Sequence, residues 1–269
     1  MDASLNFSRV WIWLNDPANW RDSASGPGVL TYLREHIVYS AIAVVVALVI
    51  ALPLGLLIGH TGRGVVLVAG SANALRAIPT YGLLVLLVVW ISPTIHIRSE
   101  VSGIVPRGGL PYLIPTEIVL VLMAIPPILT NTYAGVMNVD LDARDAARGM
   151  GMTGSQVVRK VELPCALPLI FSGVRSATLQ VIATATVAAY FPFIGGLGRL
   201  LLDGLTNLND PHLGYPKMVS GAILVALLAV LADLVLVGAQ RLTVSRGISG
   251  RFSHRQLTAT PAEVELAQA

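Results

Sequence analysis

Five long apolar stretches alternate with short polar segments along this chain. The clearest stretch, from Ile37 to Gly59, contains no charged side chain. About 20 consecutive apolar residues allow a helix to cross the ~30 Å hydrocarbon core of a bilayer, so this pattern predicts a transmembrane helix. The other four expected spans cover residues 78–91, 114–137, 167–190 and 218–239. We therefore expect an all-α integral membrane protein with about five transmembrane helices.

Glycine and proline interrupt the apolar pattern at defined places. Both are frequent in segments 92–113 and 192–216, and the first of these has the composition of a loop. Pro126 and Pro127 fall inside the third expected span. Each proline removes a backbone donor there, so we expect a kink.

The overall composition supports a membrane protein. Hydrophobic residues make up 54% of the 269 residues and charged residues 12%, and the mean hydropathy is +0.72. Soluble domains carry about 25% charged residues, so the soluble class is excluded. The isoelectric point of about 9.2 reflects lysine and arginine gathered on one side of the membrane, and it does not indicate a nucleic-acid partner. The lone Cys165 cannot form an internal disulfide.

The distribution of positive charge predicts the orientation. Five spans place the termini on opposite sides, and a cytoplasmic C-terminus puts 11 of the 18 lysine and arginine residues inside and 7 outside. The positive-inside rule then favours an outer N-terminus and an inner C-terminus. The expected parts are an external segment 1–36, a transmembrane domain 37–241 with a cytoplasmic loop 138–164, and a cytoplasmic tail 242–269.

The loop between the third and fourth spans has the pattern of two short helices joined by a tight turn. Asp140 or Asp142 can cap a first helix, and Gly151 permits the turn that a side chain would hinder. Thr153 and the glutamine three residues later form a capping box that opens a second helix. We expect that helix to end before Pro164. The motif residues are Asp145, Ala146, Ala147, Gly151, Val161, Leu163 and Pro164.

This spacing resembles the cytoplasmic signature of ABC importer permeases, which reads Glu-Ala-Ala, three residues, Gly, then nine residues to Ile-x-Leu-Pro. Asp145 stands for the glutamate and Val161 for the isoleucine. The resemblance implies a type I permease fold in the plasma membrane. It also implies that this loop docks in a cleft of an ABC ATPase subunit, where the alanine pair presents a smooth surface inside a ring of arginines (Arg144, Arg148 and Arg159).

The same resemblance implies the partners. Such permeases work as two permease subunits, identical or sister chains, with two ATPases and an extracytoplasmic substrate-binding protein. The sequence has no G-x-x-x-x-G-K-[ST] phosphate loop, so we expect the partner subunit to use the ATP and this chain to bind no cofactor. Neither a nucleophile–base pair nor metal-ligand spacing is visible in the sequence, so we expect a transport permease and not an enzyme.

Three further segments, 73–80, 176–186 and 194–199, resemble the osmoprotectant group of these permeases, particularly the actinobacterial ones. The implied substrates are glycine betaine, choline, carnitine or proline. A permease for amino acids such as methionine is the alternative within the class, because it shares the five-span layout. An ion-coupled secondary carrier is a further alternative, although it would favour paired halves with broken helices.

Several side chains are candidates to line a translocation pathway. Aromatic faces attract a quaternary ammonium, and the candidates are Tyr81, Tyr190, Phe191 and Phe193. Packing, or a place for Tyr190 at the membrane interface, is the alternative role. Polar residues in the fourth span either form interhelical hydrogen bonds or line a passage, and these are Thr178, Gln180, Thr184 and Thr186.

Three charged residues lie within or near the apolar spans. Arg76 and Arg175 are close enough to the expected cytoplasmic face to extend their side chains to it. Asp233 lies deeper, and it is the candidate proton-relay carboxylate if the protein is a secondary carrier.

A reporter that is active only outside the cell tests the predicted orientation. We expect activity when the reporter is fused near Gly108 and no activity when it is fused at Gly154 or after Arg255, because only the first position faces outward. The opposite pattern would reverse the orientation and would remove the 138–164 loop from the reach of a cytosolic ATPase.

Overall fold

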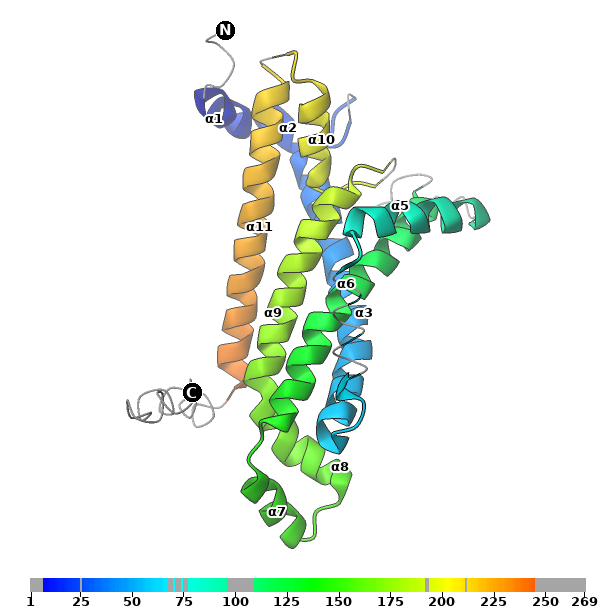
Figure 1. The fold of residues 1–269 in the computed structure, drawn as a ribbon. Helices are drawn as coiled ribbons and strands as arrows, with labels where there is room; N and C mark the ends of the chain where they lie inside the picture. The colour runs from blue at the N-terminus through cyan, green and yellow to red at the C-terminus, as the bar shows by residue number, and fades with distance from the viewer. Residues whose placement is uncertain are drawn as a thin grey trace, which may run out of the picture.

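The computed structural model describes residues 7–24, 26–66, 70, 74, 77–95, 109–191, 194–210 and 212–244, and these residues form helices and no strand. Its long helices are α3 (Val29–Thr61), α6 (Leu110–Met137), α9 (Leu163–Ala188) and α11 (Gly214–Thr243). They run along the long axis of the molecule (Figure 1). The expected all-α fold is therefore confirmed.

Four helices among the described residues are long and apolar enough to cross a membrane. Residues of the second expected span form α5 (Thr80–Ile91), which continues into the 3₁₀ turn η1 (Ser92–Thr94). Its twelve residues correspond to roughly 18 Å, which is shorter than the ~30 Å core. Four of the five expected spans are thus present as full-length helices, and α5 alone is too short to cross.

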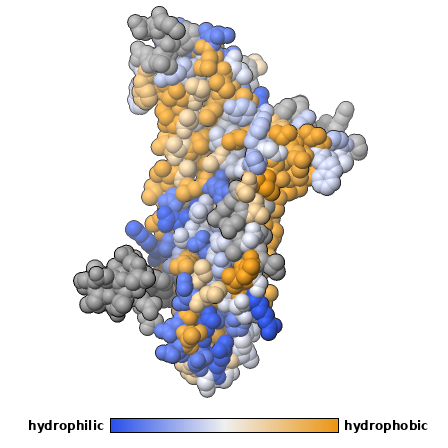
Figure 2. Space-filling view, in the orientation of Figure 1, coloured by the Kyte–Doolittle hydropathy of each residue, from blue (hydrophilic) through white to orange (hydrophobic). Residues whose placement is uncertain are grey.

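The two ends of the molecule differ. The short helices α1 (Phe7–Asn15), α2 (Pro17–Trp20) and α10 (Gly198–Thr206) lie at one end, and the loop between α6 and α9 forms the other (Figure 1). Hydrophobic residues cover much of the surface of the long helices, whereas hydrophilic residues predominate at the loop end (Figure 2). The α10 helix was not predicted, because its segment is rich in glycine and proline.

The first long helix begins at Val29, eight residues before the expected start of the span. Asp22 fixes this beginning, because its carboxylate accepts hydrogen bonds from the Gly28 amide at 2.8 Å and the Thr31 hydroxyl at 2.7 Å. Both bonds favour the ionised carboxylate, so the pKa of Asp22 lies below its usual value.

Charged Glu35 lies inside α3 without ending it. Its carboxylate accepts a hydrogen bond from the Gly196 amide at 3.0 Å. The chain at Gly195 passes so close that an added Cβ would lie 1.7 Å from a Glu35 oxygen. The segment before α10 therefore covers this carboxylate, which explains why the helix extends past the apolar stretch.

The neighbouring His36 is buried and uses both ring nitrogens. Nδ1 accepts a hydrogen bond from the Leu197 amide at 3.2 Å, and Nε2 lies 3.1 Å from the Ile182 carbonyl oxygen. An amide can only donate and a carbonyl can only accept, so the proton is on Nε2 and the ring is neutral. His36 thus joins α3 to α9 and to the segment before α10.

The helices α3, α6 and α9 pack closely because small residues lie at their contacts. A Cβ on Gly55 of α3 would lie 2.6 Å from the Thr132 Cβ of α6, and one on Gly173 of α9 would lie 2.7 Å from the Pro127 carbonyl oxygen. In a bilayer, such close approach supplies the van der Waals contact that holds helices together. α6 continues through Pro126 and Pro127 to its end.

Replacing Gly173 by alanine tests this close packing. The new methyl group would meet the backbone of α6, so we expect a loss of about 1–3 kcal/mol in the free energy of unfolding. Thermal unfolding of the purified protein in detergent measures the change. Gly238→Ala in α11 is the matched control, because nothing lies within 4 Å of a Cβ there. An equal loss of stability in both variants would contradict the packing described here.

Candidate functional site in the loop between α6 and α9

The predicted pair of helices with a tight turn is present in this loop. Asp140 caps α7 (Leu141–Gly149) by accepting a hydrogen bond from the Asp142 amide at 3.0 Å. Gly151 follows the helix with a φ of +83°, a conformation that side chains disfavour, and the chain turns there. The Gln156 side chain then accepts a hydrogen bond from the Thr153 amide at 2.8 Å, as expected for the capping box.

The expected end of the second helix before Pro164 is wrong. α8 (Gly154–Val157), the π-helical turn η2 (Val158–Glu162) and α9 follow one another without a break. In a regular helix the proline ring collides with the carbonyl four residues earlier. The π turn is wider and pairs groups five residues apart, as in the bond from the Leu163 amide to the Val158 carbonyl. Pro164 directly after it is therefore tolerated.

The motif residues divide between the outer surface of the loop and its base. Asp145, Ala146 and Gly151 are exposed. Ala147 is only 1% exposed, so the expected smooth surface comes from Ala146 and not from the alanine pair.

The remaining motif residues are half-buried where the loop joins the long helices, and they are Val161, Leu163 and Pro164. Leu163 packs against a cluster formed by Val136, Ala166 and Ile170. The outer group of motif residues is therefore the more accessible to another protein.

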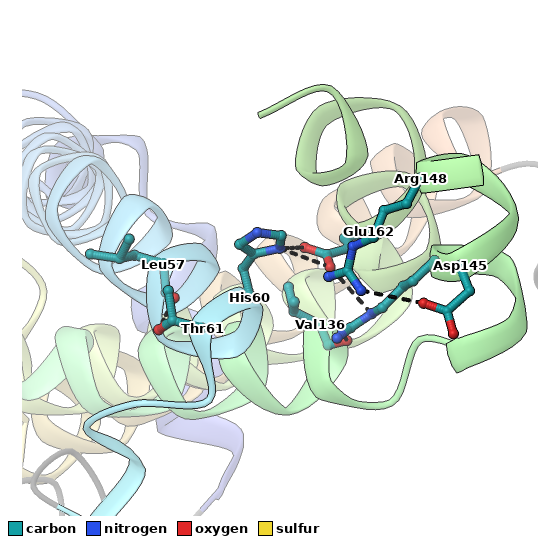
Figure 3. A network of polar contacts seen from close by, with 8 residues as sticks. Leu57, His60, Thr61, Val136, Asp145, Arg148 and Glu162 are labelled. Atoms are coloured by element: carbon teal, nitrogen blue, oxygen red, sulfur yellow. Dashed lines mark hydrogen bonds and ion pairs between the residues drawn. The ribbon is translucent and has the colours of Figure 1, made fainter. Parts of the chain in front are cut away.

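Two apolar side chains on the outer surface were not predicted. Leu141 is 69% exposed and Met150 is 72% exposed, at opposite ends of α7. Between them, Asp145 pairs with Arg148 at 3.3 Å, and both side chains are largely exposed (Figure 3). Such a surface pair contributes at most about 1 kcal/mol, so Asp145 can exchange this partner for another at little cost.

A buried polar network lies beneath the outer surface. Glu162 is 0% exposed, and its carboxylate oxygens lie 2.9 and 3.0 Å from the His60 Nδ1 atom (Figure 3). The Nε atom of Arg144 lies 3.2 Å from the same carboxylate, and another guanidinium nitrogen donates to the Val136 carbonyl. Arg144 was expected in a ring of arginines around the alanine pair, but it is buried beneath the outer surface.

The network could not be read from the sequence, in which Glu162 is one of several charged residues of a polar loop. Glu162 is 102 residues from His60 in the chain, and only the packing of α3 against the loop brings them together. Neither residue was among the predicted site residues.

Three of the aromatic pathway candidates meet at the start of α5. The Tyr81 ring lies 6.5 Å from that of Tyr190 and 6.3 Å from that of Phe191, measured between centroids. These distances are those of rings in contact, so this conformation leaves no space between them. Phe193 lies outside the described residues.

Polar candidates of α9 lie near the same place. The Gln180 amide and the Thr80 hydroxyl both contact the sulfur of Met123, at 3.9 and 3.8 Å. Met123 was not predicted. Thr184, one helical turn further along α9, is half-buried. The hydroxyls of the two other threonines of this span, at positions 178 and 186, donate to backbone carbonyls of α9 itself.

The charged residue Asp233 is paired, contrary to the expectation of an isolated carboxylate. Its two oxygens accept hydrogen bonds from Arg175 at 2.7 and 2.9 Å, which joins α11 to α9. A carboxylate held in this two-point geometry is poorly suited to carry protons, so its candidacy as a proton relay loses support. Arg76 lies outside the described residues.

Comparison with known proteins identifies a family that the chain matches. Residues 51–242 match the family described as binding-protein-dependent transport system inner membrane component. The chain is 31% identical over 226 residues to the glycine betaine/carnitine/choline transport system permease protein OpuCB of Bacillus subtilis, covering 84% of this chain and 93% of that protein. It is 32% identical to the osmoprotectant import permease protein OsmW of Salmonella typhimurium, covering 84% of this chain and 96% of that protein.

A further relative is the choline transport system permease protein OpuBB of Bacillus subtilis, which is 31% identical over 83% of this chain and 92% of that protein. Among solved structures, an inward-facing conformation of the MetNI methionine ABC transporter matches with a TM-score of 0.63. That match covers 78% of this chain and 94% of the other, at 22% identity. At this identity the likeness shows a common fold.

Proposed function

The chain belongs to the family of binding-protein-dependent transport system inner membrane components, and we propose that it is the permease subunit of an ATP-driven osmoprotectant importer. The observation that carries this proposal is similarity over more than four fifths of the chain to permeases for glycine betaine, carnitine and choline. The four long apolar helices and the type I permease fold agree with a multi-pass protein of the cell membrane. The predicted family is thereby confirmed.

The outer surface of the α6–α9 loop is the proposed ATPase-docking site. Ala146 and Gly151 carry little or no side chain, so a partner can approach the backbone closely. Leu141 and Met150 expose apolar groups at a hydrophilic end of the molecule, where a cleft in the ATPase would cover them. Asp145 would leave Arg148 and form an ion pair with a basic residue of the ATPase instead. Ala147, Val161, Leu163 and Pro164 would hold this surface in place from below.

The proposed orientation places this loop in the cytosol and the N-terminus outside. The α1 and α10 helices lie at the opposite end of the molecule, where an extracytoplasmic binding protein would deliver the substrate. A second permease subunit would complete the conduit. In this arrangement the chain performs no chemistry, and partner ATPases supply the energy.

The aromatic and polar residues at the start of α5 are the proposed pathway residues. Tyr81 and Tyr190 would offer their faces to a quaternary ammonium once the rings separate, and Gln180 and Thr184 lie on α9 nearby. In this proposal, the contact between the two rings would close the route in the present conformation.

Substitutions in the docking surface test the coupling role. We expect Gly151→Asp to abolish uptake, because it places a charged side chain at a positive φ on the docking surface. Asp145→Lys should also abolish uptake by repelling a basic partner. Gly62→Asp is the matched control for the glycine, since Gly62 also has a positive φ, of +68°, and nothing lies within 4 Å of a Cβ there, but it follows α3 outside the α6–α9 loop. It should retain most of the uptake.

Uptake of radiolabelled glycine betaine in cells, corrected for the amount of permease in the membrane, provides the measurement for these variants. Normal uptake by both Gly151→Asp and Asp145→Lys at normal expression would exclude this loop as the docking element.

Reconstitution tests the transport function itself. An apolar conduit with few fixed charges discriminates poorly among similar zwitterions, whereas an enclosed site in a binding protein can do so through desolvation and lost contacts. We therefore expect no saturable binding of glycine betaine, choline or proline to the permease alone. With its ATPase and binding protein in liposomes, it should import one of them with hydrolysis of ATP. Uptake driven by a sodium or proton gradient without ATPase would exclude this function.

A further inference from the structure

We propose that Glu162 is a positioning residue that fastens the docking loop to α3 and α6, so that movement imposed on the loop reaches the membrane helices. This inference rests on the proposed function, because such a connection is needed only where a partner subunit drives the movement of the membrane helices. It adds to that function a residue that lies beneath the docking surface and does not touch the partner.

Glu162 joins three separate helices. Its carboxylate lies 2.9 Å from His60 in the last turn of α3 (Figure 3). It also lies 3.2 Å from Arg144 in α7. Arg144 also donates to the carbonyl of Val136, one residue before the end of α6. Glu162 therefore connects the loop directly with the end of α3 and, through Arg144, with the end of α6.

Burial makes these connections difficult to separate. Glu162 has 0% exposure and Arg144 is buried, so parting them would leave charges without water or a counter-ion. Their opposite charges balance, and the protonated Nδ1 of His60 donates to the carboxylate. By contrast, the exposed pair of Asp145 and Arg148 lies entirely within α7 and connects it to nothing else.

The π turn places Glu162 at this junction. Glu162 is the last residue of η2, and the extra residue in a π turn changes the direction in which the following side chains project. Exposed Arg159 and Lys160 in the same turn point toward solvent, while Glu162 is enclosed. His60 also lies beside the start of α8, because its Nε2 atom would be 3.5 Å from a Cβ on Gly154. The contact between Glu162 and His60 therefore lies close to the start of α8 as well as at the end of η2.

The test compares the number of substrate molecules imported per ATP hydrolysed, in liposomes with the ATPase and the binding protein. In Glu162→Gln, the ATPase should still bind and hydrolyse ATP at a rate close to that of the unaltered protein. Import per ATP should fall by roughly tenfold, within the 5–150-fold range that is usual for coupling between sites. Lys160→Gln is the matched control, because it removes a charge from an exposed side chain of the same π turn and should leave the ratio unchanged.

A second variant decides the matter if Glu162→Gln does not fold. His60→Ala removes only the connection to α3, and His60 is partly exposed, so the protein should tolerate it. Import per ATP should fall in this variant as well. A spin-label distance between Asp142→Cys in α7 and Val49→Cys in α3, with Cys165→Ser, should change from a narrow to a broad distribution when His60 is replaced.

Two results would overturn the inference. One is an unchanged import-to-ATP ratio in the variants that fold, and the other is loss of ATPase association, which would make Glu162 part of the docking surface. Failure of the unaltered permease to import with ATP is a different result, because it would exclude the proposed function itself.

Discussion

A charged side chain that is shielded from water in a membrane protein is stabilised by a partner that another part of the chain supplies. Among the described residues, three such contacts join separate elements. Glu35 is covered by the backbone before α10, Arg175 and Asp233 join α9 to α11, and Glu162 connects the loop to α3 and α6. The charges therefore mark the junctions between helices. Helices held by apolar packing alone could slide past one another, and these contacts fix their relative positions.

Close packing and helix continuity complete this framework. Glycines at the contacts bring α3, α6 and α9 together along their middle parts. The second helix of the loop is continuous with α9, and residues 154–188 form one rod of 35 residues, about 52 Å long at 1.5 Å per residue. A displacement of α8 is therefore a displacement of one end of a membrane helix. The buried network makes the same displacement act on α3 and α6.

Local chemistry allowed the sequence to predict much of this arrangement. The apolar stretches predicted the long helices, Asp140 and Thr153 predicted helix beginnings, and Gly151 predicted the turn. Features that depend on residues distant in the chain could not be predicted. The burial of Glu162 depends on its contact with His60. The helix continues through Pro164 because of a π turn, which the helix propensities of the residues do not reveal. The aromatic candidates were identified by residue type, but their contact with one another required the fold.

The approach of Gly195 to Glu35 links the evolutionary histories of two positions that are 160 residues apart. A methyl group at Gly195 would occupy the present position of the Glu35 carboxylate. A lineage that acquires a side chain at position 195 must therefore move or replace the acid at position 35, and the hydrogen bond to the Gly196 amide would be lost. Among orthologues that keep this hydrogen bond, position 195 should therefore remain glycine.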